Sequence, residues 1–314
     1  MSEEKNNHPV LKTLTAAAAV GTAAYAGFSF YVFKNVFDVQ VSEYHPDTET
    51  IRKLNTNHSR NDAWYIKSNR KDVFIESFDG LKLHATQIVN HADSHNWILT
   101  AHGYRGYGLQ NMNLLYEADA HGYNILAIDQ RACGMSSGRY TGMGWSEHYD
   151  VSSWIVYLTN LDPESKICLY GNGMGAVSIM NAVGDYMPAN VVCAIEEGGY
   201  SGIRELLASV IADKYKVNGS VFAKGIDMYA KQILHFSIYD ANTRRQLMQS
   251  STPMLFVHGE IDSAVPVEML YDCYYACAAD KELYTVANAE HDACISNEHY
   301  LETVFAFMKK HIEK

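Results

Sequence analysis

The sequence predicts an α/β fold in which helices cover both faces of a mainly parallel sheet. From residue 71 onward, short apolar runs of strand length alternate with segments of helical length. The chain has 314 residues, of which 47% are hydrophobic, so it is long enough for one large core and an accessory segment. We therefore expect one principal domain over residues 71–314.

Eight strands are expected along the chain. The first two flank Phe78-Asp79-Gly80, a turn pattern typical of a β-hairpin, so antiparallel strands should open the sheet. The other six are the apolar runs NWILTAHG, YNILAID, KICLYG, VVCAIEE, PMLFVHG and ELYTV. Helices between and after them are expected near residues 114–120, 149–158, 174–183, 268–278 and 304–311.

A longer insertion separates VVCAIEE from PMLFVHG. Residues 202–252 have helical periodicity and no run typical of a strand. In an open α/β sheet, ligands bind beyond the carboxyl ends of the strands, and an insertion at this place lies above them. We expect a small helical cap over a binding site.

The N-terminal segment contains an uncharged run from Thr13 to Phe33. As a helix, this run would be roughly 30 Å long, which matches the apolar thickness of a bilayer. The sequence therefore predicts a tail at 1–12, a transmembrane anchor at 13–33 and a linker at 34–70.

Two other interpretations of this run stay open. Ala24-Tyr25-Ala26 resembles a signal-peptide cleavage site, and the run would also suit a buried or interfacial helix. Lys5 and Lys12 precede the run and Lys34 follows it, which slightly favours a cytoplasmic N-terminus and an extracytoplasmic main domain.

Composition argues against several kinds of partner. The formal net charge is -11, which disfavours a nucleic-acid surface, because a phosphate backbone selects clustered Lys and Arg. The six cysteines contain no CxxC pair, so no zinc site is expected. His91 and His95 lie in a polar loop, where a solvated role is favoured over metal binding. We expect no metal and no cofactor.

The most informative motif is LYGNGMGAVS, residues 169–178. Gly171, Gly173 and Gly175 lie where an apolar strand is followed by a helix. A nucleophile elbow, G-x-S-x-G, occupies this strand–turn–helix context in α/β-hydrolases. Here the central residue is Gly173 instead of serine.

From Asp72 to the C-terminus, the chain resembles the serine-hydrolase branch of the α/β-hydrolase family, especially the membrane-anchored cell-surface hydrolases of Gram-positive bacteria. The resemblance is carried by SFDGLKLHA, HGYRG, DQRACGMSSG, GMGWSEHYD, IEEGGYS, PMLFVHGEIDSAVP and the late His291, which occur in the family's order. It implies an α/β-hydrolase fold with a mainly parallel eight-stranded sheet, a small helical cap and a membrane anchor.

The resemblance also implies a role for individual residues. Gly173 stands at the nucleophile position, Asp262 matches the acid that orients the histidine, and His291 matches the general base. The backbone N–H groups of Tyr104 and Met174 match the oxyanion hole. The chain departs from the pattern at Ala132, Glu290 and, most importantly, Gly173, which has no oxygen to attack an acyl group.

Three functions are compatible with these residues. The first is a degenerate hydrolase, weak or inactive, which binds a small acyl ligand under the cap. The second is an active hydrolase of small ester or peptide substrates, acting through water at Gly173 or through a serine encoded at this position in the native gene. The third is a dinucleotide-binding protein, because Gly171-x-Gly173-x-x-Ala176 follows a strand and Glu196 ends the next one.

Several other residues are candidates of lower interest. Ser136, Ser137 and Ser178 are possible substitute nucleophiles, but none occupies the elbow. His102 and His258 each precede a glycine at a strand end, where a structural role is favoured.

Overall fold

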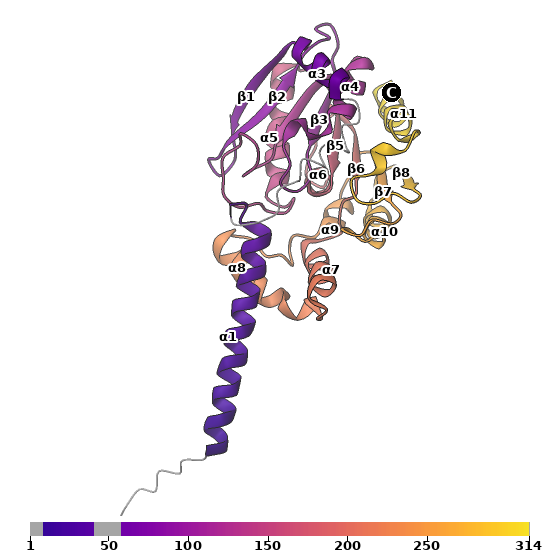
Figure 1. The fold of residues 1–314 in the computed structure, drawn as a ribbon. Helices are drawn as coiled ribbons and strands as arrows, with labels where there is room; N and C mark the ends of the chain where they lie inside the picture. Colours follow the sequence, from indigo (N-terminus) through magenta and orange to yellow (C-terminus); the bar gives the residue numbers. More distant parts are fainter. Residues whose placement is uncertain (1–8, 41–57, 314) are drawn as a thin grey trace, which may run out of the picture.

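The computed structural model describes residues 9–40 and 58–313. Its centre is one sheet with the strand order β1-β2-β4-β3-β5-β6-β7-β8 (Figure 1). The strands are β1 (Arg70–Glu76), β2 (Lys82–Ile88), β3 (Asn96–Ala101), β4 (Asn124–Asp129), β5 (Lys166–Asn172), β6 (Val191–Glu197), β7 (Met254–Gly259) and β8 (Lys281–Val286). β2 pairs antiparallel with β1 and β4, and every other neighbouring pair is parallel. The predicted eight-stranded, mainly parallel sheet is confirmed.

Helices cover both faces of this sheet, as the buried strands require. Successive strand residues such as Ile98 and Leu99 belong to two different apolar clusters, one on each side. One cluster includes residues of α4 (Met112–Ala120) and α11 (Tyr300–Ile312), and α3 (His58–Lys67) packs beside α4. The other includes residues of α5 (Glu147–Leu161), α6 (Met174–Ala182) and α10 (Glu268–Ala276).

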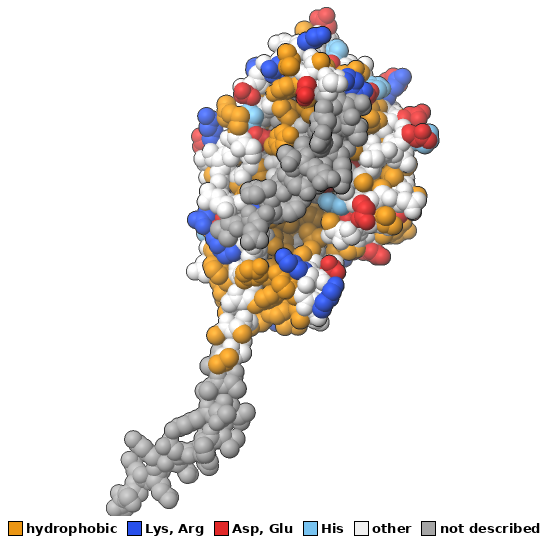
Figure 2. Space-filling view, in the orientation of Figure 1, with side chains coloured by type: hydrophobic (Ala, Val, Ile, Leu, Met, Phe, Trp, Pro, Cys, Tyr) orange, Lys and Arg blue, Asp and Glu red, His pale blue; other side chains and the backbone are white. Residues whose placement is uncertain are grey.

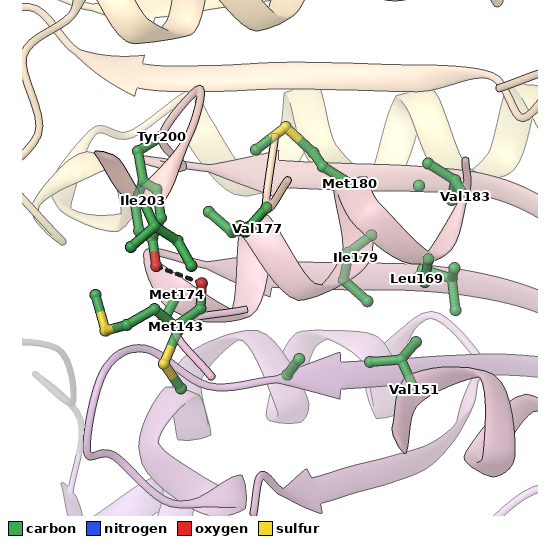
Figure 3. Packing of buried hydrophobic residues seen from close by; sticks show 14 of the residues in the cluster. Met143, Val151, Leu169, Met174, Val177, Ile179, Met180, Val183, Tyr200 and Ile203 are labelled. Carbon is green, nitrogen blue, oxygen red and sulfur yellow. Dashed lines mark hydrogen bonds between the residues drawn. The ribbon is translucent and has the colours of Figure 1, made fainter. Parts of the chain in front are cut away.

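The insertion between β6 and β7 is helical, in the region expected to form a cap. It contains α7 (Ile203–Tyr215), the 3-10 turn η2 (Gly219–Phe222), α8 (Ala223–Ile233) and α9 (Thr243–Leu247). At its start, Tyr200 and Ile203 lie close to Met143 and Met174 (Figure 3). The Tyr200 hydroxyl donates a hydrogen bond of 2.9 Å to the Met143 carbonyl. The beginning of this insertion is therefore held against the loop that precedes α5.

The N-terminal helix α1 (Pro9–Phe37) projects from the domain at the end where α7 and α8 lie (Figure 1). The helix continues past Phe33, the predicted end of the anchor, to Phe37. Phe33 and Phe37 lie one helical turn apart on the same face, and both side chains are fully buried in the domain. The predicted linker, 34–70, is partly helical. It contains the end of α1 and, at 58–67, the helix α3, and its residues 41–57 lie outside the described residues.

Among the residues that the structure describes, no helix combines the length and the apolar character needed to cross a membrane. The anchor at 13–33 stays a prediction, and most of the tail at 1–12 lies outside the described residues.

Candidate active site

The elbow lies where β5 ends and α6 begins. Gly173 has a φ of +53° and a ψ of −116°, a conformation that L side chains rarely adopt. Its N–H donates a 2.8 Å hydrogen bond to the carbonyl of Glu197 at the end of β6. The strand, turn and helix thus present position 173 at the carboxyl edge of the sheet.

The three glycines of the elbow serve different purposes. A Cβ on Gly171 would lie 2.4 Å from the Gly175 backbone, and one on Gly175 would lie 2.1 Å from the Ala101 carbonyl oxygen. These two positions require glycine because the backbones of β3, β5 and α6 meet there. A Cβ on Gly173 would meet only ordinary contacts, the nearest being His291 Nε2 at 3.5 Å. At Gly173 the backbone angle favours glycine, and the space for a side chain is present.

His291 and Asp262 form a hydrogen-bonded pair beside the elbow. Asp262 follows β7, His291 follows β8, and 2.7 Å separates Asp262 Oδ2 from His291 Nδ1. The other Asp262 oxygen accepts hydrogen bonds from the backbone N–H groups of Ala264 and Val265, which fixes the carboxylate. The structure therefore brings the predicted acid and base together, and His291 Nε2 lies 3.5 Å from where a Cβ at position 173 would be.

The pair is charged at neutral pH. Burial lowers the pKa of His291, but the hydrogen bond to Asp262 and the nearby Asp292 carboxylate outweigh it and raise the pKa to about 9. Burial raises the pKa of Asp262, but hydrogen bonds to His258 and His291 bring it well below its usual range. The predominant state at pH 7 is an imidazolium–carboxylate pair, so His291 is a good hydrogen-bond donor and a poor base.

Three neighbours of this pair were not predicted as site residues. Asn172, just before the elbow, donates a 3.1 Å hydrogen bond to Asp292 Oδ1, which lies 3.9 Å from His291 Nε2. The buried His258 has its Nε2 3.3 Å from Asp262 Oδ2 and 2.9 Å from the Val265 carbonyl. Their place in the sequence could have indicated them, because Asn172 and Asp292 directly adjoin Gly173 and His291, and His258 precedes Asp262 by four residues.

A buried carboxylate supports the elbow from the sheet side. Glu197 accepts hydrogen bonds of 2.5 Å from both Tyr170 and Tyr300. Burial raises its pKa, and these two hydroxyl groups partly offset the rise. Because the carbonyl of Glu197 also receives the Gly173 N–H, this cluster holds the elbow in place.

The two predicted oxyanion donors belong to segments that adjoin position 173. Met174 is the first residue of α6, so its N–H has no acceptor within the helix and lies at the positive end of the helix dipole. Tyr104 follows Gly103, whose Cα would lie 3.8 Å from a Cβ at position 173. The Tyr104 hydroxyl donates a 2.6 Å hydrogen bond to the Val36 carbonyl, and Arg105 donates to the carbonyl of Asp38. The end of α1 therefore holds the loop that carries Tyr104.

The other serines and histidines singled out from the sequence have structural partners. Ser178 is buried and donates to Gln130 Oε1, and Ser136 donates to the Asp129 carbonyl. His102 is buried and bonds the carbonyl of Gly103 and the N–H of Gln130. These contacts hold the loops after β3 and β4 together.

His91 and His95 lie near Asp119 and Asp162, respectively. Within the described residues, no group of three or more His, Cys, Asp or Glu side chains is arranged to hold a metal ion. All six cysteines are buried free thiols.

The geometry does not favour a dinucleotide at the β5–α6 turn. Glu196, the acidic residue that would meet a ribose, is fully buried, and its carboxylate accepts the N–H of Gly199 at 3.0 Å. Burial raises the pKa of Glu196 to about 7. The carboxylate is directed into the protein, where a cofactor cannot reach it.

Comparison with known proteins identifies the fold. No family model matches the chain. YqkD, an uncharacterized protein of Bacillus subtilis, is 24% identical over 264 residues, which cover 83% of this chain and 86% of YqkD. The esterase Pf2001 of Pyrococcus furiosus superposes with a TM-score of 0.64 at 23% identity, covering 79% of this chain and 94% of the esterase. The α/β-hydrolase GrgF of Penicillium sp. sh18 superposes with a TM-score of 0.60 at 18% identity, covering 78% of this chain and 99% of GrgF. The chain has the α/β-hydrolase fold.

Proposed function

We propose that this protein is a degenerate serine hydrolase, which binds small acyl compounds under its cap and hydrolyses esters and amides weakly or not at all. The observation that supports this proposal is Gly173, which occupies the elbow with the backbone angles of a nucleophile position and no side chain. Acyl transfer by this machinery requires an oxygen that the histidine activates, and position 173 supplies none.

The groups that remain are suited to binding an acyl group. An acyl oxygen at the elbow would receive N–H groups from Met174 and from the loop of Tyr104. The His291 imidazolium, with its pKa raised to about 9, adds a donor beside them. These groups stabilise partial negative charge on a carbonyl oxygen whether or not a covalent bond forms.

Slow hydrolysis by water is a second candidate, and the space at position 173 favours it. The volume of the missing serine side chain lies beside His291 Nε2, where His291 could take a proton from a water molecule. Triad enzymes that lack a member retain roughly 10³–10⁴-fold catalysis over water. Because His291 must be neutral to act as a base, such activity would rise with pH through about 9.

Restoring the nucleophile tests the assignment. Gly173→Ser places a hydroxyl beside His291 Nε2. At pH 9, where about half of the His291 side chains are neutral, the variant is expected to hydrolyse p-nitrophenyl acetate and to react covalently with a fluorophosphonate, while the unsubstituted protein stays unlabelled. The additional change His291→Ala should abolish the gain. Intact-protein mass spectrometry detects the adduct.

Gly198→Ser is the matched control. Gly198 also has a positive φ, +65°, and a Cβ there would lie 3.5 Å from His291, but against Cε1 instead of Nε2. This variant introduces the same hydroxyl and similar backbone strain away from the nucleophile position, so it should stay unlabelled. Labelling of both variants, or of neither, would contradict the assignment of position 173 as the elbow. An unsubstituted protein that turns over the ester rapidly at pH 7 would contradict the proposal of a degenerate enzyme.

A further inference from the structure

Exposed apolar side chains gather at the end of the molecule where α1 leaves the cap. Figure 2 shows hydrophobic side chains concentrated over this end, around the junction of α1 with the cap helices. We call this surface the cap face. Its exposed members are Val20, Phe30 and Tyr31 of α1, Val210 of α7, Val217, Val221 of η2 and Met228 of α8.

The cap face is held together by packing between its helices. The rings of Phe28 and Phe222 lie 4.5 Å apart, and those of Phe30 and Tyr229 lie 5.1 Å apart. The Tyr25 hydroxyl donates a 3.0 Å hydrogen bond to the Val221 carbonyl. Single exposed apolar residues are ordinary, but a group on packed helices marks an interaction surface.

The charge around this surface is opposite to that of the whole chain. Residues 203–247 contain seven Lys or Arg and four Asp or Glu, a formal charge of +3, within a chain of formal charge -11. Lys214, Lys216 and Lys224 are exposed. Asp227, one of the four acids, is largely buried and paired with Lys231. The apolar surface thus has basic residues beside it.

We propose that the cap face binds the surface of an anionic lipid bilayer, with its apolar side chains at the boundary of headgroups and acyl chains and its lysines among the headgroups. α1 projects from the end of the molecule that carries this surface, and its sequence is uncharged from Thr13 to Phe33 (Figure 1). A second copy of the chain fits less well, because a symmetric pair would oppose two positive surfaces. Interfacial binding requires no spanning helix, and it is independent of the proposed function.

A fluorophore on the cap face tests the proposal in the full chain. Met228→Cys, at a position 52% exposed, is labelled with an environment-sensitive dye such as NBD, since the native cysteines are all buried. Ile66→Cys, 71% exposed on α3 at the far end of the domain, is the control. Vesicles containing phosphatidylglycerol should shift the Met228 label to shorter wavelength and brighten it, and leave the Ile66 label unchanged. Vesicle-bound protein with an unchanged Met228 label would overturn the proposal.

Charge reversal tests the contribution of the lysines. Combined Lys214→Glu, Lys216→Glu and Lys224→Glu should weaken binding to these vesicles by at least about tenfold, since each lysine near an anionic surface contributes measurably to affinity. Lys309→Glu with Lys310→Glu, on α11, should leave binding unchanged. Equal losses in both variants would overturn the assignment to the cap face, because overall charge alone would then govern binding. Failure to bind vesicles, with self-association that Val221→Glu abolishes, would assign the surface to a second copy.

Discussion

Gly173 and His291 carry the proposal of a degenerate hydrolase, because their geometry is that of a triad and position 173 has no side-chain oxygen. The positive φ of Gly173, the 2.7 Å contact between His291 and Asp262, and the helix start at Met174 are all present. The difference from a working triad lies in the charge of His291. With Asp262 on one side and Asp292 3.9 Å from Nε2 on the other, the imidazole is held in its protonated form. A group that acts as a base in a triad is better suited here to donate a hydrogen bond.

The elbow glycines should differ in their response to substitution. Gly173→Ala adds a Cβ with ordinary contacts but a strained φ, so it should lower the free energy of unfolding by about 1–2 kcal/mol. Gly171→Ala forces a Cβ to within 2.4 Å of the Gly175 backbone, so it should cost at least about 3 kcal/mol. Urea unfolding of both variants measures the difference. Equal losses would mean that crowding does not distinguish these two positions.

The helix α1 belongs to the folded domain as well as projecting from it. Phe33 packs in the core near Phe37 and Tyr140, with ring separations of 5.2 and 6.3 Å. The last turn of α1 also accepts hydrogen bonds from Tyr104 and Arg105, so the helix positions the loop of a predicted oxyanion donor. A chain that began at residue 35 would lose the packing of Phe33 and expose the apolar side chains it covers.

A pair of substitutions on α1 measures this packing. Phe33→Ala should lower the free energy of unfolding by about 3–4 kcal/mol, because the side chain is fully buried. Phe30→Ala, on the same helix and 42% exposed, should lower it by about 1 kcal/mol or less. Denaturant titration of both variants gives the comparison. If Phe33→Ala were as mild as Phe30→Ala, the C-terminal part of α1 would not contribute to the core.

The sequence predicted the strands and helices of the sheet well and the contacts between distant segments less well. The glycine spacing around Gly173 placed the elbow between a strand and a helix, because local sterics determine such a turn. The proximity of Asp262 and His291 was predicted from the family resemblance alone. It depends on the order of the strands, which places β7 beside β8, and no local sequence pattern reveals that order. The position of the Asp292 carboxylate near His291 was not predicted, because it depends on a backbone φ of +57° at Asp292, which the residue type does not reveal. The burial of Phe33 corresponds to one of three interpretations of the N-terminal run that the sequence left open, because an apolar helix face suits lipid and protein equally.

His291 and Glu196 should both lower the stability of the folded protein as the pH rises, His291 above about 6.5 and Glu196 between about 4.5 and 7. His291 has a pKa raised above its unfolded value of 6.5, so its contribution is fully present below 6.5 and is lost as the pH rises through about 9. Glu196 acts in the same direction: its pKa is raised to about 7, so ionisation between its unfolded value of 4.5 and 7 costs folded stability. Asp262 contributes a constant amount over this range, because its lowered pKa affects stability only in acid.

Two variants separate the contributions to this decline. His291→Gln removes a stabilising cation, so it should be less stable than the unsubstituted protein at pH 6.5, by about 2 kcal/mol, and the difference should shrink as the pH rises through about 9. Glu196→Gln removes a buried carboxyl that ionises only at a cost, so its stability relative to the unsubstituted protein should improve from pH 5 to pH 8. Thermal unfolding midpoints from pH 5 to pH 9.5 measure both effects. If the His291→Gln curve ran parallel to that of the unsubstituted protein, His291 would not be protonated on folding, and the charged pair with Asp262 would be wrong.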